Sequence, residues 1–177
     1  MPPEGNALLT PGVQLQVLVA DDHQMVSEGL QFMLEKDSRV AAVRTAGTVE
    51  EIFTALAARC PDIFLLDIDL GTNSGLDLIE QIRDHCPSTT IILLTADKRV
   101  QTLQEALQRN IDGYQLKDAP VRTLIEAMLK AREGHLVLPA EIGAVPSEAG
   151  PSAAGEDTTA RLTARETEVY HLLLQGR

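Results

Sequence analysis

Polar residues that can carry out phosphoryl chemistry follow four separate apolar runs of this sequence. Asp21 and Asp22 follow the run LQVLVA, and Asp67 ends the run DIFLLD. Thr95 ends TIILLT, and Lys117 ends GYQLK. Three carboxylates brought together repel one another, and a single lysine cannot neutralise them. Such a group either binds a hard divalent cation or has a raised carboxyl pKa. A ligand set made only of oxygens fits Mg²⁺, which also coordinates phosphate oxygens.

These residues together predict a phosphoryl site. Each one alone is an ordinary polar residue at the end of a strand, but their joint occurrence is hard to dismiss. A carboxylate can attack phosphorus and hold the group as an acyl phosphate, while a metal ion and a lysine balance the oxygen charges. Asp67 is the best candidate nucleophile because a buried strand would fix its backbone. The adjacent pair Asp21 and Asp22 is better suited to hold the metal, and Thr95 to donate a hydrogen bond to a phosphoryl oxygen.

Five repeats of strand and helix position these residues. The first, third and fourth apolar runs are continuously apolar, which is typical of parallel strands covered by helices on both faces. The sequence therefore predicts an α/β fold in which a five-stranded parallel sheet is doubly wound, with ligands bound at the carboxyl ends of the strands. The expected strands are 15–20, 40–46, 62–67, 90–95 and 113–117, and the expected helices are 23–36, 48–59, 75–84, 98–109 and 121–133.

Composition and charge narrow the class of protein. The chain has 177 residues, of which 44% are hydrophobic, so one core of ordinary size is expected. A net charge of −11 argues against unassisted binding to nucleic acid or to an anionic membrane surface. No apolar run approaches membrane-spanning length, and the first residues lack a signal-peptide pattern, so we expect no membrane association and a cytoplasmic protein.

The cysteines and histidines do not form a recognisable site in the sequence. Cys60 and Cys86 have neither metal-ligand spacing nor the pattern of a disulfide framework, so we expect reduced structural thiols. The histidines are scattered, and for each of them a structural or surface role is expected. They are His23, His85, His135 and His171.

Both ends of the chain differ from the repeats. Residues 1–13 form an uninformative extension, and 139–160 is rich in Ala, Gly, Pro, Ser and Thr, which is typical of a flexible linker. The end, LTARETEVYHLLLQGR at 162–177, begins with the capping box Thr163 and Glu166 and continues with an apolar helical stripe. A further helix is therefore expected here, without a sequence-adjacent helix to pack against.

Four segments of the chain resemble the receiver domains of bacterial two-component response regulators. They are VLVADDH at 17–23, LLDIDLGTNSG at 65–75, LLTA at 93–96 and GYQLKD at 113–118. The resemblance implies a flavodoxin-like receiver over 14–138. The last segment, 161–177, resembles the first helix of a LuxR-type helix-turn-helix, which implies the NarL/FixJ subfamily and a chain truncated within its helix-turn-helix domain.

The resemblance assigns roles to the residues at the strand ends. It implies that Asp67 accepts a phosphoryl group from a sensor histidine kinase. Asp22 would bind Mg²⁺ directly, Asp21 through water, and Asp67 and the backbone carbonyl of Asp69 would complete the protein ligands. Lys117 would contact the phosphoryl group.

The resemblance also implies how the signal is used. Thr95 and Tyr114 would form the switch pair that reports phosphorylation. The protein would regulate transcription rather than act as an enzyme, with intrinsic autophosphorylation and autodephosphorylation as its only chemistry. It would be able to form a homodimer on phosphorylation, and only the full-length protein would bind DNA, because base recognition needs the second helix of the helix-turn-helix.

Two other classes share part of this pattern. Asp67-Ile68-Asp69 followed by Gly71-Thr72 superficially resembles an aspartate-nucleophile phosphatase of the haloacid dehalogenase type, although a short motif alone is weak evidence. A flavodoxin-like flavin-binding module could have the same sheet. The acidic DDHQM after the first strand would repel a flavin phosphate. Gly71 also stands where receivers usually have proline, which predicts a more mobile loop.

Overall fold

A five-stranded parallel sheet forms the centre of the protein in the computed structural model, which describes residues 14–139. The strand order is β2-β1-β3-β6-β7, so the predicted doubly wound α/β fold is confirmed. The predictions for 1–13 and for 140–177, including the linker and the terminal helix, lie outside the described residues. The strands are β1 (Leu15–Ala20), β2 (Val40–Ala46), β3 (Ile63–Asp67), β6 (Thr90–Thr95) and β7 (Gly113–Leu116).

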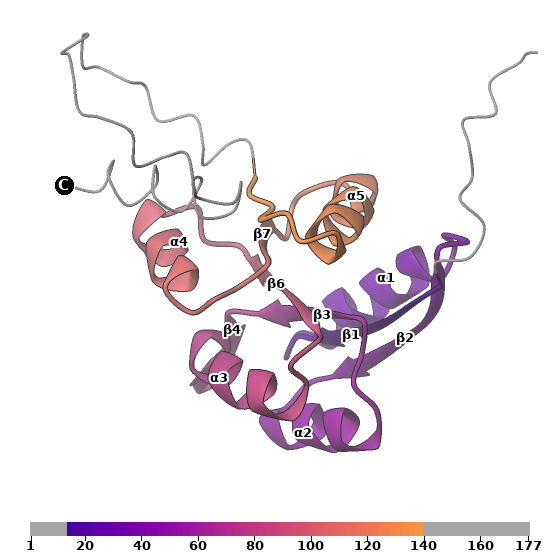
Figure 1. Cartoon of the computed structure of the whole chain (residues 1–177), viewed down its shortest axis with the longest axis horizontal. Helices are drawn as coiled ribbons and strands as arrows, with labels where there is room; N and C mark the ends of the chain where they lie inside the picture. The colour runs from indigo at the N-terminus through magenta and orange to yellow at the C-terminus, as the bar shows by residue number, and fades with distance from the viewer. Residues whose placement is uncertain (1–13, 140–177) are drawn as a thin grey trace, which may run out of the picture.

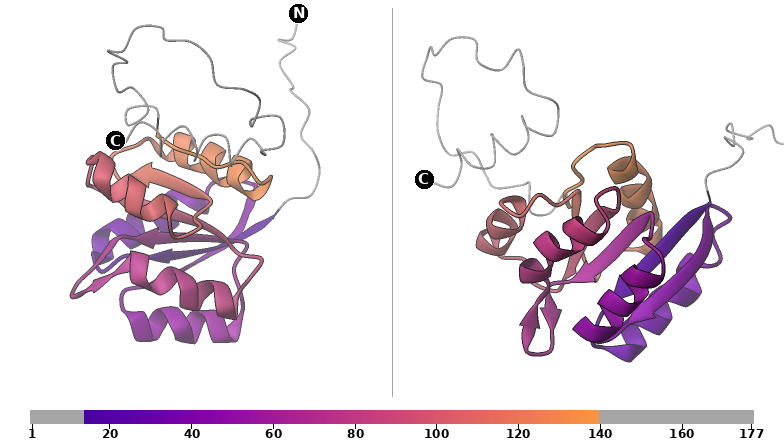
Figure 2. Two further views of the ribbon diagram at one scale, coloured as in Figure 1. Left: turned by 60° about the vertical axis from the view of Figure 1, so that its left-hand side comes forward. Right: turned by 60° about the horizontal axis from the view of Figure 1, so that its bottom comes forward.

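Helices cover both faces of this sheet and give three layers (Figures 1 and 2). Helices α1 (Gln24–Leu34) and α5 (Val121–Arg132) lie on one face. Helices α2 (Val49–Ala58), α3 (Gly75–His85) and α4 (Val100–Leu107) lie on the other. In the described part of the chain, no helix has both the length and the apolar character needed to cross a membrane.

The strand residues divide between two hydrophobic clusters because successive side chains point to opposite faces. Phe64 and Leu66 of β3 pack with helices α2, α3 and α4, whereas Ile63 and Leu65 pack with α1 and α5. All four side chains are fully buried. The continuous apolar run that precedes Asp67 is therefore explained by burial on both faces.

The outer edge of β7 is partly covered by the chain that follows α5. The amide of Tyr114 donates to the carbonyl of Val137 at 2.8 Å, and the amide of Val137 donates to the carbonyl of Asp112 at 3.1 Å. Val137 thus pairs in parallel with Gly113. This isolated β-bridge was not predicted.

The segment after Asp67 forms a two-stranded antiparallel hairpin, β4 (Asp69–Leu70) and β5 (Asn73–Ser74), that projects from the body (Figure 2, right). Gly71 has a φ of +61° at the first position of the two-residue turn. A hairpin turn of the II′ type requires such a positive φ, which glycine adopts without strain and proline cannot. Gly71 therefore has a conformational role, where the sequence indicated only a mobile loop.

The prediction of two reduced thiols was wrong, because Cys60 and Cys86 form a disulfide with a Cα–Cα distance of 5.6 Å. Cys60 follows helix α2, and Cys86 caps the carboxyl end of α3. The two helices pack side by side on one face of the sheet (Figure 1), which brings together residues that are 26 apart in the sequence. Spacing along the chain gave no indication of this contact.

Candidate phosphoacceptor site

The predicted site residues lie at the carboxyl edge of the sheet. Strands β1 and β3 are neighbours, and the helices that follow them, α1 and α3, lie on opposite faces, so the loops after β1 and β3 diverge. Ligands of open α/β sheets bind in the crevice at such a point. Asp21 after β1 and Asp67 at the end of β3 are both about 1% exposed there.

Lys117 connects the two buried carboxylates. Its Nζ lies 2.6 Å from Oδ2 of Asp67 and 2.7 Å from Oδ2 of Asp21. The contact with Asp67 is also a hydrogen bond, whereas Asp21 Oδ2 has no hydrogen-bond donor among the described residues. The Lys117–Asp21 contact is therefore an ion pair without hydrogen-bond geometry. It leaves a buried carboxylate oxygen able to accept a further donor or a cation.

His23 belongs to this cluster, although the sequence assigned it only a structural or surface role. Its Nδ1 lies 2.8 Å from Oδ1 of Asp22 and 3.2 Å from Oδ1 of Asp21. The amide of His23 also donates to Asp21 Oδ1 at 2.8 Å. Its position directly after the acidic pair, before the first turn of α1, was the available signal.

The donor atoms fit a divalent cation. Asp21, Asp22, His23 and Asp67 each offer one ligand atom, and these atoms lie within 4.8 Å of one another. The three carboxylates supply the oxygen ligands that Mg²⁺ and Ca²⁺ prefer. The described geometry thus agrees with a hard-cation site, and so does Asp21 Oδ2, which has an ion-pair contact but no hydrogen-bond donor.

Burial and charge shift the pKa values at this edge. Burial raises the pKa of Asp67, against the hydrogen bond and the charge of Lys117, which lower it. Burial opposes the charge of Lys117, but its close contacts with the carboxylates of Asp21 and Asp67 outweigh this effect and raise its pKa. Lys117 therefore stays charged, and ionisation of Asp67 is favoured by every cation close to it.

The predicted switch pair meets at the backbone of Asp97 and not at Asp67. The hydroxyl of Thr95 accepts a hydrogen bond from the amide of Asp97 at 2.9 Å, and the hydroxyl of Tyr114 donates to its carbonyl at 3.4 Å. Both Thr95 and Tyr114 are fully buried, and burial raises the pKa of Tyr114 to about 12. One turn of the β6–α4 loop therefore contacts both side chains.

The carboxylate of Asp97 fixes this turn. It accepts from the amide and guanidinium of Arg99 and, at 2.6 Å, from the hydroxyl of Thr102. The Arg99 side chain holds the pKa of Asp97 well below its usual range. The sequence did not single out Arg99 or Thr102, because their role depends on the loop conformation.

Gly75 allows the hairpin and helix α3 to begin close to Asp67. A Cβ atom at this position would lie 2.1 Å from the carbonyl oxygen of Asp67. The amide of Gly75 donates to the carbonyl of Ile68 at 2.7 Å. The amide of Asp69 donates to Asp67 Oδ1 at 3.2 Å. The backbone therefore surrounds the nucleophile candidate closely, while the metal-binding role of the Asp69 carbonyl stays a prediction.

A five-stranded parallel sheet with clustered carboxylates and a lysine at its carboxyl edge defines the class of phosphoryl-accepting α/β domains. The model of the response regulator receiver domain matches residues 17–129, and the chain belongs to this family. The family assignment agrees with the resemblance seen in the sequence.

Relatives place the chain among NarL-type regulators. It is 30% identical over 161 residues to the nitrate/nitrite response regulator NarP of Escherichia coli, covering 91% of this chain and 75% of NarP. It is 31% identical over 130 residues to the transcriptional regulatory protein LnrK of Bacillus subtilis, covering 73% of this chain but only 59% of LnrK.

A solved structure supports the same class. A response regulator from Burkholderia pseudomallei, with a phosphorylated aspartic acid and a calcium ion, superposes with a TM-score of 0.60 at 31% identity. The match covers 67% of this chain and 69% of that one. These comparisons support neither a haloacid dehalogenase-type phosphatase nor a flavin-binding module. The acidic pair after β1 precedes Asp67 and Asp69 in the chain, as the receiver pattern requires.

Proposed function

We propose that Asp67 is the phosphoacceptor of a receiver that controls a DNA-binding output domain. The observation that carries this proposal is the position of Lys117, whose Nζ contacts both buried carboxylates, Asp67 and Asp21, at 2.6 and 2.7 Å. A lysine in this place can neutralise charge on transferred phosphoryl oxygens. The phosphorylated aspartic acid of the Burkholderia pseudomallei relative supports the same chemistry.

The proposed step is a phosphoryl transfer to a carboxylate. An oxygen of Asp67 forms a bond to phosphorus while the bond between phosphorus and the imidazole nitrogen of a histidine kinase breaks. The leaving nitrogen keeps the electron pair of that bond and takes up a proton from solvent. Asp67 must be ionised, and the charge of Lys117 favours the ionised form against burial. With acetyl phosphate as donor, a P–O bond breaks instead.

A divalent cation bound by Asp21, Asp22 and Asp67 would neutralise phosphoryl charge in this step. We propose Mg²⁺ because the carboxylates offer only hard oxygen ligands. Asp22 would bind it directly and Asp21 through water, with the Asp69 carbonyl as a further ligand. Thr95 would turn its hydroxyl toward the phosphoryl group and so release the amide of Asp97.

The output would be transcription regulation, as the name of the transcriptional regulatory protein LnrK indicates for that protein. We propose a sensor histidine kinase as the phosphodonor and a homodimer as a possible phosphorylated form. DNA contacts would belong to a complete helix-turn-helix, since a chain with a net charge of −11 has little electrostatic attraction for DNA. Fluorescence anisotropy with promoter-sized duplexes, for this chain and for one extended through a full helix-turn-helix, tests this assignment.

Phosphorylation by acetyl phosphate and Mg²⁺ tests the site directly. Mass spectrometry should detect one phosphate per chain, stable in acid and labile in base, as expected for an acyl phosphate. Asp67→Asn should lose the label, whereas Asp84→Asn, which changes an exposed carboxylate of α3, should keep it. Equal labelling of Asp67→Asn and the parent chain would show that another residue is the phosphoacceptor.

Lys117→Ala separates attachment of the phosphate from the response to it. This variant should keep part of the label and lose the conformational change, because Lys117 lies between the nucleophile and the strand β7 that carries Tyr114. The intrinsic fluorescence of the tyrosines, or amide exchange in the β6–α4 loop, measures the response. A normal response in Lys117→Ala would contradict its proposed role.

A further inference from the structure

The first turn of helix α4 is not held in place by burial of its own side chains. Val100 is 38% exposed and Gln101 is exposed too, whereas burial on the sheet begins at Leu103. The backbone hydrogen bond that closes this turn, from the amide of Leu103 to the carbonyl of Arg99, is 3.4 Å long, beyond the usual range of about 2.7–3.2 Å. Arg99 precedes the helix, and its guanidinium is a donor only, so it cannot accept from the free amides of the first turn. The turn therefore depends on contacts from outside the helix.

Asp97 supplies such contacts from the β6–α4 loop. Its carboxylate accepts from the hydroxyl of Thr102, the third residue of the helix, at 2.6 Å and from the amide of Arg99 at 2.9 Å. Nε of Arg99 donates to the same carboxylate at 2.8 Å. A negative charge beside the N-terminus of a helix also stabilises the helix. We call Asp97, Arg99 and Thr102 the Asp97 cap, which joins the end of the loop to the start of α4.

The backbone of Asp97 is bound by the switch pair at the same time. Its amide donates to the hydroxyl of Thr95 at 2.9 Å, and its carbonyl accepts from the hydroxyl of Tyr114 at 3.4 Å. Thr95 and Tyr114 belong to the neighbouring strands β6 and β7 and are fully buried, so their backbones are fixed in the sheet. Asp97 therefore connects to the sheet through its backbone and to helix α4 through its side chain.

We propose that Arg99 and Thr102 are positioning residues that couple helix α4 to the state of Thr95 through Asp97. The inference rests on the proposed phosphorylation of Asp67. When Thr95 turns its hydroxyl to the phosphoryl group, it releases the amide of Asp97, and residues 97–102 then move as one unit with the start of α4. Without the cap, changes in the φ and ψ angles of the loop absorb the movement before it reaches the helix.

The two donors of the cap do not contribute equally. The side chain of Arg99 is 77% exposed, and water and salt weaken exposed ion pairs. The hydroxyl of Thr102 belongs to a half-buried residue and forms the shorter bond. Loss of this hydroxyl should therefore uncouple α4 more than loss of the Arg99 charge. Both residues act on Asp97 rather than on Asp67, so phosphorylation itself should be preserved.

Amide hydrogen exchange of α4 in the 177-residue chain, with and without acetyl phosphate and Mg²⁺, tests the proposal. In the parent chain, phosphorylation should change the exchange rates of the amides of residues 103–107 by about threefold or more. Thr102→Val, which removes the hydroxyl and keeps the shape of the side chain, should retain the label on Asp67 and lose most of this change. Thr102→Ser, which restores the hydroxyl, should recover the change, and Arg99→Gln should lose only part of it.

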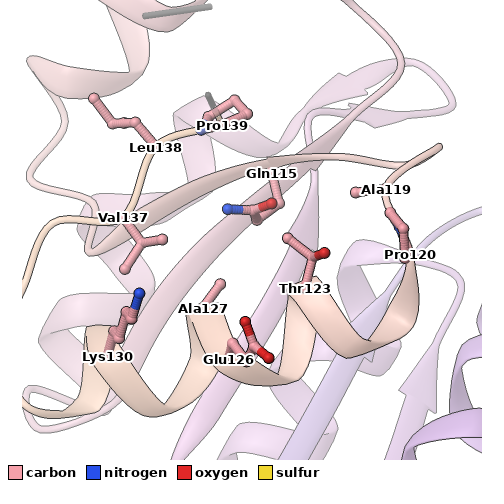
Figure 3. A pocket seen from close by; sticks show the side chains of 10 residues that line it. All are labelled: Gln115, Ala119, Pro120, Thr123, Glu126, Ala127, Lys130, Val137, Leu138 and Pro139. Atoms are coloured by element: carbon pink, nitrogen blue, oxygen red, sulfur yellow. The ribbon is translucent and has the colours of Figure 1, made fainter. Parts of the chain in front are cut away.

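Thr123→Val is the matched control. Thr123 is the third residue of α5, as Thr102 is of α4, and it lines a pocket between α5 and β7 (Figure 3). This variant should keep both the label and the full response of α4.

A response as large in Thr102→Val as in Thr123→Val, with both chains fully labelled, would overturn the coupling and leave Asp67 as the phosphoacceptor. Faster exchange of α4 in Thr102→Val in both states, at an unchanged ratio, would show that the cap only stabilises the helix and would also overturn the coupling. Absence of label on the parent chain would instead reject the proposed function, on which the coupling rests. If Thr102→Val does not fold, Arg99→Gln decides, and a full response in that variant overturns the coupling.

Discussion

Similar charged residues lie at the amino ends and at the carboxyl ends of the sheet strands, which we call the amino edge and the carboxyl edge, but they are paired differently. At the amino edge, Asp112 accepts from the guanidinium of Arg83 and from the amide of Ile91, and Asp62 accepts from the amide of Gln16 and pairs with Arg132. At the carboxyl edge, three carboxylates share one lysine and one histidine. At the amino edge each of these carboxylates has a cationic partner, so the pairs stabilise the fold. At the carboxyl edge the carboxylates outnumber their cationic partners, which favours binding of a cation from solvent.

The amino edge is also cross-linked. Arg83 donates to the carbonyls of Thr89 and Asn110, and the hydroxyl of Thr89 donates to the carbonyl of Pro61. The disulfide of Cys60 and Cys86 lies at the same edge. Stabilising contacts are therefore concentrated at the amino edge, and the candidate reactive residues lie at the carboxyl edge. Four changes to the protein test this division.

Reduction of the disulfide should give the largest loss of stability. The bond closes a loop whose ends are 26 residues apart and which contains β3 and Asp67. Constraint of the unfolded chain by such a loop is worth about 3 to 4 kcal/mol. Urea denaturation with and without a thiol reductant measures the change, and labelling by acetyl phosphate should be retained. A loss of labelling in the still-folded reduced protein would contradict the separation of the two edges.

Gly75→Ala should damage the carboxyl edge. Its Cβ would lie 2.1 Å from the carbonyl oxygen of Asp67, so the backbone must shift, at a cost of about 2 to 3 kcal/mol. Labelling of Asp67 should fall as well. Gly29→Ala in helix α1 is the matched control, because a Cβ there meets no atom within 4 Å. Alanine should stabilise that helix by about 0.5 to 1 kcal/mol. Similar effects of the two substitutions on denaturation would contradict the close-approach argument.

Asp67→Asn should raise the free energy of unfolding of the metal-free protein, by less than Gly75→Ala lowers it. Burial raises the folded-state pKa of Asp67 above its ordinary value of 3.8, so its ionisation disfavours the folded state. The difference between variant and parent should be absent below that ordinary value and should grow as pH rises through the folded-state pKa. Lys117 keeps Asp21 as a partner in the variant.

Thermal unfolding across this pH range, in a chelator, measures the effect. Addition of Mg²⁺ should then stabilise the parent more than Asp67→Asn, because the variant has lost a carboxylate ligand. Identical pH profiles for the two proteins would show that the charge of Asp67 carries no cost in the folded state.

His23→Ala should have the smallest effect. The side chain is 67% exposed, and an exposed ion pair contributes about 0.2 to 1 kcal/mol. If His23 only braces Asp21 and Asp22, Mg²⁺ affinity should change less than threefold, as measured by calorimetry. A loss of more than tenfold would instead identify His23 as a metal ligand. Gln24→Ala, one residue further along α1, is the control.

The positions of many candidate site residues could be predicted, because the end of a strand is marked by a short local pattern in the sequence. The apolar run before Asp67 located it at the end of a buried strand, and parallel strands must place their carboxyl ends at one edge. Thr95 and Tyr114 were predicted as a pair, but their common contact with Asp97 was not, because that contact depends on the conformation of the β6–α4 loop. The hairpin around Gly71 was missed, since a two-residue turn leaves only a weak pattern in the sequence.

The sequence by itself determined the layered α/β fold and the shared edge of Asp21, Asp67 and Lys117, because apolar periodicity and chain direction act over short stretches. Only the tertiary structure decided that Cys60 meets Cys86. This contact depends on how helices that are separate in the chain pack against one sheet. Such contacts depend on the packing of the whole core, so they cannot be deduced from the spacing of residues along the chain.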